Sequence, residues 1–544
     1  MNQQKLALKS IRVEQFKAIQ DSTEIKFNPL TAFIGYNGSG KSSLIEALET
    51  LQDIITTDLD TAMQRWRGIE HVWNKQSPHT QKLRETKNIS RPHHSNPISF
   101  RLQGYTKQNH YQAKMLVNLD PNRETIFIQE ETVTTKQKKE LWRDARGQVF
   151  SYKNNEWEPE AVVDAGQSAW SNRLKSFVNS WQFLLLTPSQ MGQPAARRRT
   201  GGTITLNKDG SNIAEYLLDI YNRDQDIFAG ILKTLQSIVD YAGDLQSSIT
   251  SEIEQMVYLQ LTEGKAKIPG WLLSTGTLRL VSLLAVLRHP EPPPLIVIEE
   301  VENGFDPRTV QLITKEIKEL AKSGRSQIII TTHSPALLDK LELSNIVLVK
   351  REGHSPTFHS PSDHGFLRQW THKYGIGYLY STNTLHSLSD TSEYKETVDR
   401  IELGLRVLID IHLTKSVNQE NYWKRYIPGD VKDPVKKKTD QALRQNPYLG
   451  PSYFYPCLIR LQYCDVAHYE RIITHNWEYF EEIFGDKDNL RKHFAHYRVL
   501  RNSNAHPKAI SDVEKMNADA AVLWFDNIIN AYLSSNEPSS NEED

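Results

Sequence analysis

The first hundred residues alternate between short apolar runs and polar or glycine-rich segments. Apolar and polar residues alternate from Ser10 to Phe16, and an apolar block follows at Thr31 to Ile34. Both patterns predict β-strands, and the apolar spacing that begins near Ser43 (SLIEALETL) predicts an amphipathic helix. The chain therefore starts in the order strand, glycine-rich loop, helix. The polar stretch from about Thr56 to Arg91 is predicted to be part of an insertion.

The middle of the chain carries two kinds of β pattern. Alternating runs between Pro97 and Thr134, continued by VFSYKNNEWEPE, predict antiparallel strands that form a β lobe on the first domain. A Gly- and Arg-rich loop at Ala195 to Gly202 precedes the helical segment SNIAEYLLDIYN. Strand and helix patterns alternate again from about Leu272 to Val349. These patterns predict an α/β domain with an antiparallel β lobe and a helical insertion, the inserted segment running from about residue 52 to 270.

The last third of the chain changes to long amphipathic helices. Asp390 to Leu413 has one apolar face, and Asp486 to Asn502 repeats the pattern. Ser511 to Ala531 opens with a Ser511/Glu514 capping box. We therefore expect an all-α domain over residues 387–535, after a first domain of residues 1–386, and a disordered acidic tail over 536–544.

Composition mainly excludes classes of protein. The 544 residues suggest two to four domains, and Lys plus Arg (65) nearly equals Asp plus Glu (66), which argues neither for nor against nucleic acid. Two cysteines, Cys457 and Cys464, exclude a disulfide framework and a four-thiolate zinc site. No signal-peptide core or 18-residue apolar run occurs, so we expect a cytoplasmic protein with no membrane contact.

A glycine-rich loop joins the apolar block to the first helix. The segment from Gly35 to Ser42 (GYNGSGKS) fits the pattern G-x-x-x-x-G-K-[ST]. In this pattern backbone N–H groups cradle phosphates, the lysine neutralises them, and the final hydroxyl holds Mg²⁺. An incidental lysine beside a glycine turn is the weaker interpretation, because the required strand and helix flank the motif. We expect ATP and its metal to be bound by Gly35, Asn37, Gly38, Ser39, Gly40, Lys41, Ser42 and Ser43.

A later apolar strand, Leu295 to Ile298, ends in Glu299 and Glu300. A nucleotide site needs such a strand end, with one acid for the water shell of the metal and one base for the attacking water. Alone, the pattern would be better explained by an edge strand that ends in solvated acids. It is accompanied by LSTGTLR at Leu273 to Arg279 and by a following strand that ends in Thr-Thr-His333.

In this order and spacing, the segments resemble the ABC-type head of the SMC, RecF and OLD ATPases, more specifically the AAA_21-like group. The resemblance extends over roughly residues 5 to 385 and includes DGSNIAEYL at Asp209 to Leu217. It implies a P-loop fold and a signature motif in which Ser274 and Gly276 cap the γ-phosphate of the opposite subunit. The other implied roles are Glu299 as the Walker B acid and metal ligand, Glu300 as the general base, Asp306 in the D-loop and His333 as the switch histidine.

Two features depart from the family pattern. The Walker B acid is glutamate (Glu299) rather than the commoner aspartate, and Val301 stands where a proline is usual. The geometry can therefore differ although both carboxylates remain. The Q-loop glutamine stays open, with Gln64 and Gln182 as candidates.

The resemblance also implies how the nucleotide and a second copy bind. Phe16 and Lys17 stand where such heads contact adenine or its neighbouring phosphates, although a core position explains Phe16 equally well. Because the signature motif acts on a neighbour's P-loop, we expect a head-to-head homodimer around two ATP molecules. No sustained heptad pattern interrupts the head, which argues against a long-armed SMC role.

The last domain contains Arg501-Asn502-Ser-Asn-Ala-His506 at the end of an apolar-striped helix. The segment resembles Swt1-type HEPN ribonucleases over about residues 388–535. The resemblance implies a His506 near the RNA 2′-hydroxyl and an Arg501 beside the scissile phosphate. The alternative is that both residues cap and ion-pair a helical bundle. A second Arg-x-x-x-x-His, at Arg491 to His496, is better explained as a solvated helix face.

The basic segment Asn421 to Gln445 carries tyrosines and a tryptophan among its lysines, and we interpret it as a basic loop that weakly favours single-stranded RNA.

The main hypothesis is an ATPase head that binds ATP and Mg²⁺ and gates a metal-independent HEPN ribonuclease in antiviral defence or toxin-type growth arrest, with tRNA as one possible target. One alternative is an ATPase that scaffolds or regulates a separate effector, with a non-catalytic C-terminal bundle. Another is a RecF-like DNA repair ATPase.

Overall fold

The computed structural model of the chain describes residues 6–75, 96–105, 110–120, 125–135, 138–144, 146–153, 156–197, 204–250, 255–363, 371, 375–381, 385, 393–417, 422–445, 454, 456–505 and 512–535. These residues form two compact units, Met1–Tyr378 and Leu379–Asp544. Helix α13 (Ile376–Ser381) spans the division between them.

The first unit contains a nine-stranded sheet in which every pairing is antiparallel. Its order is β10-β9-β8-β7-β6-β5-β1-β2, with β3 also beside β1. In β5, Phe100 and Leu102 are buried while Arg101 is exposed, as the period of two requires. The predicted β lobe is therefore confirmed. The strands are β1 (Ala7–Phe16), β2 (Ile19–Asp21), β3 (Ile25–Lys26), β5 (Ile98–Tyr105), β6 (His110–Asp120), β7 (Thr125–Thr135), β8 (Lys138–Arg143), β9 (Gln148–Lys153) and β10 (Glu156–Val162).

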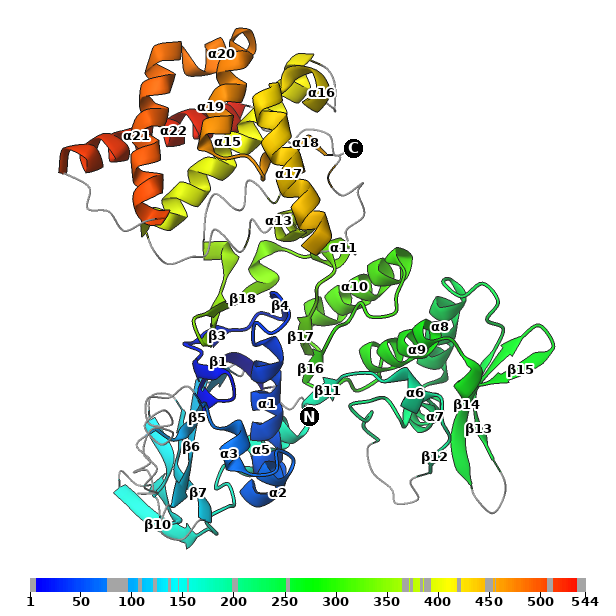
Figure 1. Cartoon of the computed structure of the whole chain (residues 1–544). Helices are drawn as coiled ribbons and strands as arrows, with labels where there is room; N and C mark the ends of the chain where they lie inside the picture. The colour runs from blue at the N-terminus through cyan, green and yellow to red at the C-terminus, as the bar shows by residue number, and fades with distance from the viewer. Residues whose placement is uncertain are drawn as a thin grey trace. The chain divides into compact units, whose positions relative to one another are not determined.

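A six-stranded sheet forms the centre of the same unit. Its order is β11 (Gln182–Leu184), β16 (Leu295–Ile298), β17 (Gln327–Thr331), β4 (Leu30–Ile34), β18 (Ile346–Glu352) and β19 (Ser355–His359). The first five strands are parallel, and β19 is antiparallel to β18. Every residue of β4, β16 and β17 is buried, as expected for parallel strands covered on both faces. Figure 1 shows the blue β4 among green strands from much later in the chain.

The parallel arrangement brings three loops to one edge of this sheet. The glycine-rich loop follows β4, the Glu299 segment follows β16, and the His333 segment follows β17. Carboxyl ends of parallel strands form the usual ligand-binding crevice of such sheets. Helix α1 (Lys41–Thr56) starts from this edge and buries Leu44, Leu48 and Leu51.

The remaining part of the first unit is a small four-stranded sheet with helices. Helix α7 packs on β13 and β14, and α9 packs on α8 and α10 (Figure 1). The strands are β12 (Ala195–Ala196), β13 (Leu245–Ile249), β14 (Met256–Glu263) and β15 (Ala266–Pro269). Besides α1, the described helices of the whole first unit are α2 (Leu59–Gln64), α3 (Ile69–Val72), α5 (Asn172–Asn179), α6 (Pro188–Met191), α7 (Ile213–Arg223), α8 (Gln225–Gln236), α9 (Thr275–Leu287), α10 (Pro307–Lys322) and α11 (Pro335–Leu338), with short 3₁₀ turns at Gly270–Leu272, Leu343–Asn345 and Pro361–Asp363. Of these, α2 and α5 pack on α1.

The second unit is helical where it is described. Helix α15 (Glu393–Val417) contacts α18 to α22, and its apolar residues Ile401, Leu405 and Leu408 are fully buried, as the helical spacing predicts. The other helices are α16 (Trp423–Tyr426), α17 (Gly429–Gln445), α18 (Cys457–Leu461), α19 (Val466–His475), α20 (Trp477–Phe484), α21 (Lys487–Ala505) and α22 (Asp512–Ser535). Ser511 of the predicted capping box lies outside the described residues. So does the acidic tail from residue 536 onwards.

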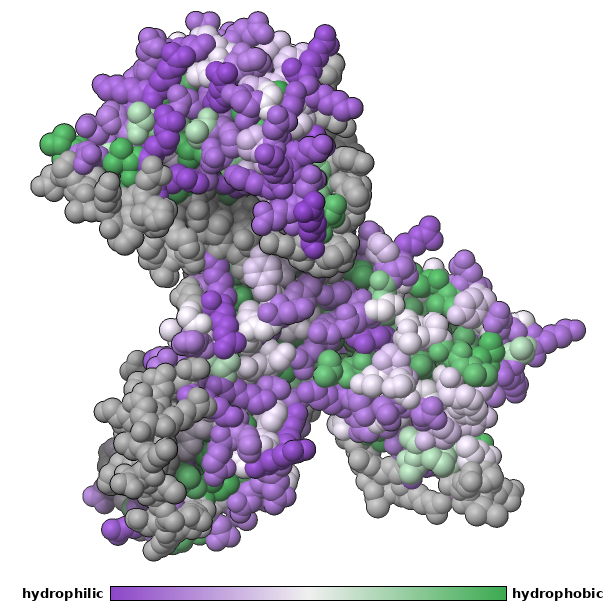
Figure 2. Space-filling view, in the orientation of Figure 1, coloured by the Kyte–Doolittle hydropathy of each residue, from purple (hydrophilic) through white to green (hydrophobic). Residues whose placement is uncertain are grey.

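The prediction of a basic loop between Asn421 and Gln445 is wrong, because most of this segment forms α16 and α17. Val431, Val435 and Thr439 are buried at a spacing of four residues, so one helix face packs inward. The lysines at 436 to 438 lie on the exposed side, within the hydrophilic surface that Figure 2 shows over α17. Among the described residues, no helix is both long enough and apolar enough to cross a membrane.

Candidate functional site

The loop between β4 and α1 has a backbone that requires glycine. Gly38 and Gly40 have φ values of 77° and 113°, which side chains rarely adopt. A Cβ on Gly40 would also lie 2.7 Å from Pro356, and one on Gly35 would lie 2.2 Å from the carbonyl oxygen of Val349. The loop leads directly into the N-terminus of α1, where free backbone N–H groups and the helix dipole favour an anion.

Lys41 and Ser39 of this loop have polar groups that could bind a phosphate. The Lys41 ammonium donates to the carbonyls of Gly35 at 2.7 Å and Tyr36 at 3.1 Å, and burial lowers the pKa of Lys41 to about 8. Ser39 is buried, and its hydroxyl has no hydrogen-bond partner among the residues described. A buried hydroxyl without a partner, an ammonium whose hydrogen bonds among the described residues go to its own loop, and a glycine-dependent turn at a helix N-terminus together fit a nucleotide phosphate.

Glu300 lies close enough to Lys41 for its carboxylate to raise the pKa of that lysine, against the larger effect of burial. Its backbone has a φ of 49°, held by a 2.8 Å hydrogen bond from its N–H to the hydroxyl of Thr331. Asn303 donates its side-chain amide to the Glu300 carboxylate. The predicted general base is thus exposed and oriented by a neighbouring amide.

A third acid, Glu302, belongs to the same group and was missed by the sequence reasoning. Its Oε1 accepts a 2.6 Å hydrogen bond from the backbone N–H of His333, while Oε2 is buried with no partner among the described residues. His333 is half-buried, and burial followed by the charge of Lys41 lowers the pKa of its imidazole. The structure therefore brings Lys41, Glu300, Glu302 and His333 together, although their segments are far apart in sequence.

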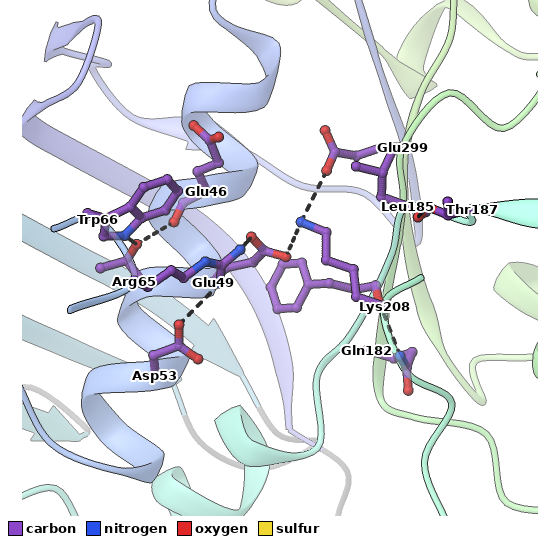
Figure 3. Close-up of polar contacts among 12 residues, drawn as sticks. Glu46, Glu49, Asp53, Arg65, Trp66, Gln182, Leu185, Thr187, Lys208 and Glu299 are labelled. Carbon is purple, nitrogen blue, oxygen red and sulfur yellow. Dashed lines mark hydrogen bonds and ion pairs between the residues drawn. The ribbon is translucent and has the colours of Figure 1, made fainter. Parts of the chain in front are cut away.

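Glu299 has a different set of partners. Its carboxylate lies 3.6 Å from the Lys208 ammonium, which also lies 2.5 Å from Glu49 of α1 (Figure 3). Glu299 is mostly buried, and burial raises the pKa of its carboxylate, partly opposed by Lys208. Lys208 was not predicted as a site residue. A lysine immediately before the Asp209-Gly-Ser match was the available signal.

The metal that such a site implies fits the side chains that are present. Ser42 is exposed at the start of α1, and its hydroxyl and the Glu299 carboxylate offer hard oxygen ligands. Within the described ranges, no group of three or more His, Cys, Asp or Glu side chains could hold a metal on its own. Mg²⁺ is usually held by one or two protein oxygens together with substrate phosphates.

The LSTGTLR segment starts helix α9. Exposed Ser274 caps it, accepting a 3.1 Å hydrogen bond from the N–H of Thr277. Gly276 lies so near the following loop that a Cβ would be 2.9 Å from the Gly304 carbonyl. Asp306, the predicted D-loop acid, accepts hydrogen bonds from two backbone N–H groups at the start of α10 and so acts as its cap.

Arg279 connects this helix to the site. It is buried, and it donates to the carbonyls of Leu186 at 2.9 Å and Glu300 at 3.2 Å. The helix that carries Ser274 and Gly276 is thereby tied to the loops that follow β11 and β16 in the same chain.

Of the remaining candidates of the first unit, Gln182, Phe16 and Lys17 have structural partners. Gln182 is buried and donates its amide to the backbone carbonyl of Leu206 at 2.7 Å, whereas Gln64 is exposed at the end of α2. Phe16 is fully buried in the hydrophobic core, as its alternative interpretation proposed. Lys17 lies 2.7 Å from Glu46 and over the ring of Trp66.

In the second unit, the partly exposed Arg501 belongs to a charged network with Glu402 and Arg406. Its Nε donates to Glu402 at 2.8 Å, and Glu402 also accepts from Arg406 at 3.1 Å. Asn502 lies within α21, but its side chain is outside the described set, as is the whole of His506. Arg491 is exposed and lies 3.2 Å from Asp488.

Two family models match the chain, both within the first unit. Residues 197–339 match AAA_21, described as "AAA domain, putative AbiEii toxin, Type IV TA system", and residues 7–61 match AAA_15, described as "AAA ATPase domain". A "Putative ABC transporter ATP-binding protein" of Methanosarcina acetivorans is 31% identical over 112 residues. That alignment covers 20% of this chain and 39% of the archaeal protein.

The solved structures that match this chain include heads of SMC proteins, all with TM-scores below 0.5. The SMC head bound to the C-winged helix domain of ScpA has 14% identity and a TM-score of 0.36, covering 65% of this chain and 97% of that one. The SMC head domain from Thermotoga maritima has 16% identity and a TM-score of 0.30, covering 65% of this chain and 98% of that one. The head with an extended coiled coil bound to the C-terminal domain of ScpA, from Pyrococcus furiosus, has 11% identity and a TM-score of 0.35, covering 68% and 100%.

Proposed function

We propose that the first unit, for which the family matches support an ABC-type ATPase head, hydrolyses ATP and uses its nucleotide state to gate RNA cleavage by the helical unit. The observation that carries the ATPase part is the meeting of Lys41, Glu300, Glu302 and His333 at the edge of the parallel sheet. A phosphate-binding lysine beside an oriented carboxylate is the arrangement that hydrolysis of a phosphoanhydride needs.

The roles of the side chains follow from this geometry. Lys41 and the N–H groups at the start of α1 hold the β- and γ-phosphates. Glu300, oriented by Asn303, accepts a proton from the attacking water as its oxygen bonds to the γ-phosphorus and the bond to the bridging oxygen breaks. Glu302 holds the backbone of His333, which would lie beside the γ-phosphate. Bound Mg²⁺, on Ser42 and Glu299, would neutralise phosphate charge.

Exposed side chains support a head-to-head homodimer. Ser274 is exposed at the start of α9, and the neighbouring Trp271 and Leu272 are 45% and 69% exposed. Tyr36 of the P-loop is 56% exposed. Large apolar side chains beside both halves of the expected interface are typical of a surface that a second subunit covers.

The ribonuclease part of the proposal rests on the HEPN-like motif and on a surface that could pair two helical units. His506 would take the proton of the RNA 2′-hydroxyl and Arg501 would stabilise the phosphate charge. On α22, Val513, Met516 and Leu523 are 64%, 67% and 63% exposed, and Figure 2 shows apolar surface near the start of this helix. Their spacing of three and seven residues places them on one helix face, as in helix pairs. Growth arrest in a toxin or antiviral system is the role that we propose for this activity.

A second candidate is a non-catalytic helical unit that lets the ATPase scaffold or restrain a separate effector. The ion pair between Arg501 and buried Glu402 favours it, because it gives Arg501 a structural partner. The two candidates differ in what His506 does.

The deciding experiment compares growth and total RNA, tRNA included, in cells that express wild type, Lys41→Ala or His506→Ala. Our proposal predicts arrest and RNA cleavage with wild type only. Loss with Lys41→Ala but not with His506→Ala would favour the second candidate. In purified protein, Glu300→Gln should bind ATP normally. Its ATP turnover should be slower than that of wild type by a factor of about 100 or more, the usual range for a removed general base.

A further inference from the structure

Lys208 is fixed beside the Walker B strand by its own backbone. Its carbonyl accepts a 2.8 Å hydrogen bond from the N–H of Leu185, and the carbonyl of Asp209 accepts one of 2.9 Å from Thr187. Leu185 directly follows β11, which pairs with β16. The loop that carries Lys208 therefore runs along the strand end from which Glu299 projects.

The Lys208 ammonium lies between two buried carboxylates (Figure 3). It is 2.5 Å from Glu49 and 3.6 Å from Glu299, whose side chains are 4% and 11% exposed. Glu49 has a second cation, because Arg65 lies 2.6 Å from it and 3.1 Å from Asp53. Acidic and basic side chains thus alternate in the order Glu299, Lys208, Glu49, Arg65 and Asp53.

The two acids depend on Lys208 to different degrees. Glu49 keeps Arg65 if Lys208 moves away. Glu299 has Lys208 as its one ion-pair partner within the part of the chain that the structure describes. A buried carboxylate without a cation is costly, so Lys208 neutralises Glu299 in the nucleotide-free head.

The same position creates a conflict when a metal arrives. A divalent cation held by Glu299 would share that carboxylate with an ammonium, and like charges at such distances repel strongly in a partly buried site. Glu49 already lies closer to the ammonium than Glu299 does, so Lys208 keeps an ion-pair partner when it moves away from Glu299.

We propose that Lys208 acts as a built-in counterion that stands in for Mg²⁺ beside Glu299, and that its ammonium must give up the 3.6 Å contact with Glu299, keeping the 2.5 Å contact with Glu49, before Mg²⁺ can bind there with the nucleotide. This inference rests on the proposed ATPase function. It makes Lys208 a positioning residue that sets how much Mg²⁺ strengthens nucleotide binding. Glu49 is its partner in the metal-bound state.

The test measures the affinity of a fluorescent, non-hydrolysable ATP analogue in EDTA and in saturating Mg²⁺, and takes the ratio of the two. Lys208→Met should increase the Mg²⁺-dependent gain in affinity about threefold or more, and Glu49→Gln should decrease it by a similar factor. Lys265→Met, an exposed lysine in the turn between β14 and β15, is the matched control and should leave the ratio unchanged.

A second readout needs no nucleotide. In EDTA, Lys208→Met should melt at a lower temperature than wild type and Lys265→Met, because Glu299 loses its cation. An unchanged or smaller Mg²⁺-dependent gain in Lys208→Met would overturn the inference, as would an unchanged gain in Glu49→Gln if Lys208→Met does not fold. Wild type that binds the analogue no better than Lys41→Ala would instead overturn the ATPase proposal, and the Lys208 inference with it.

Discussion

The backbone N–H of His333 donates a 2.6 Å hydrogen bond to Oε1 of Glu302. This bond joins the segments after β16 and β17, and Glu302 is two residues before Gly304, which packs against Gly276 of the signature segment. Movement of His333 toward or away from a γ-phosphate would therefore reach α9 through the Glu302 side chain and the close approach of Gly304 to Gly276.

Replacing Glu302 should slow ATP turnover more than it weakens ATP binding. In Glu302→Ala the His333 N–H loses its acceptor, while Lys41 and the P-loop are unchanged. We expect turnover to fall about tenfold, with the affinity for a non-hydrolysable analogue within about threefold of wild type. Steady-state phosphate release and analogue titration check this. Glu319→Gln, an exposed acid on α10, is the control, and equal losses in both variants would contradict the role of Glu302.

The affinity for ATP should depend on pH through Lys41. Burial lowers the pKa of this lysine from 10.5 to about 8 in the nucleotide-free protein, and the phosphates bind its charged form. Affinity should therefore be constant below about pH 7.5 and fall up to about tenfold for each further unit above pH 8. For stability the sign is reversed: the unfolded chain holds the extra proton between about pH 8 and 10, so this lysine makes the folded state relatively more stable as pH rises.

Analogue titrations from pH 7 to 9.5 check the affinity. Lys41→Arg keeps its charge over this range and should give a flat profile if it still binds nucleotide. A wild-type profile that is equally flat would show that Lys41 does not titrate in this window.

The β lobe should depend on one fully buried ion pair. Arg143 of β8 lies 3.5 Å from Glu131 of β7, and both side chains are 0% exposed. Arg143 also donates to the carbonyls of Asp164 and Ala165, so the pair connects two strands to the segment that leaves the lobe. Arg143→Met should lower the free energy of unfolding by about 3 kcal/mol, because it leaves a buried carboxylate without its cation.

Chemical denaturation measures this effect. Adding Glu131→Gln to Arg143→Met should recover part of the loss, since the amide oxygen can still accept from the N–H of Ala169, now bonded to the Glu131 carboxylate. Lys153→Met, which breaks the exposed pair with Glu160, should show no measurable change. A double variant less stable than the single one would contradict the role of charge.

The role of Arg501 can be separated from that of His506 by combining stability with RNA cleavage. Removing Arg501 leaves Arg406 as the cation beside Glu402. Arg501→Ala should therefore destabilise the bundle by about 1–2 kcal/mol whichever function is correct. His506→Ala should leave the melting temperature unchanged and abolish RNA cleavage if the unit is a ribonuclease. Retention of full RNA cleavage by His506→Ala would exclude the proposed catalytic role.

Most of the fold followed from local patterns. Period-two alternation predicted β5 to β7, and glycines, Lys41 and flanking apolar runs predicted the P-loop. The helix at α17 was missed because its mean composition is very polar and it contains Pro434, while the inward-facing Val431 and Val435 are a small minority of its residues. Sparse apolar positions on a charged helix give a weak periodic signal.

Residues of the candidate site could be proposed from sequence where a motif fixes their spacing, and were missed where only the fold brings them together. Glu299, Glu300 and His333 follow apolar strands and could be named in advance. Lys208 reaches Glu299 through the pairing of β11 with β16, which are more than a hundred residues apart in sequence. Such a contact depends on the order of strands in the sheet, and no local pattern encodes that order.

The position of β4 in the central sheet also determines when that sheet can form during translation. β4 is complete once residue 34 has been translated, but its two neighbours, β17 and β18, end at residues 331 and 352. At elongation rates of about 5–20 residues per second, the ribosome needs roughly 15–60 seconds more before that strand has both partners. During synthesis, β4 therefore stays unpaired until almost the whole first unit has been translated. The C-terminal helices leave the ribosome only after all strands of the parallel sheet have been made.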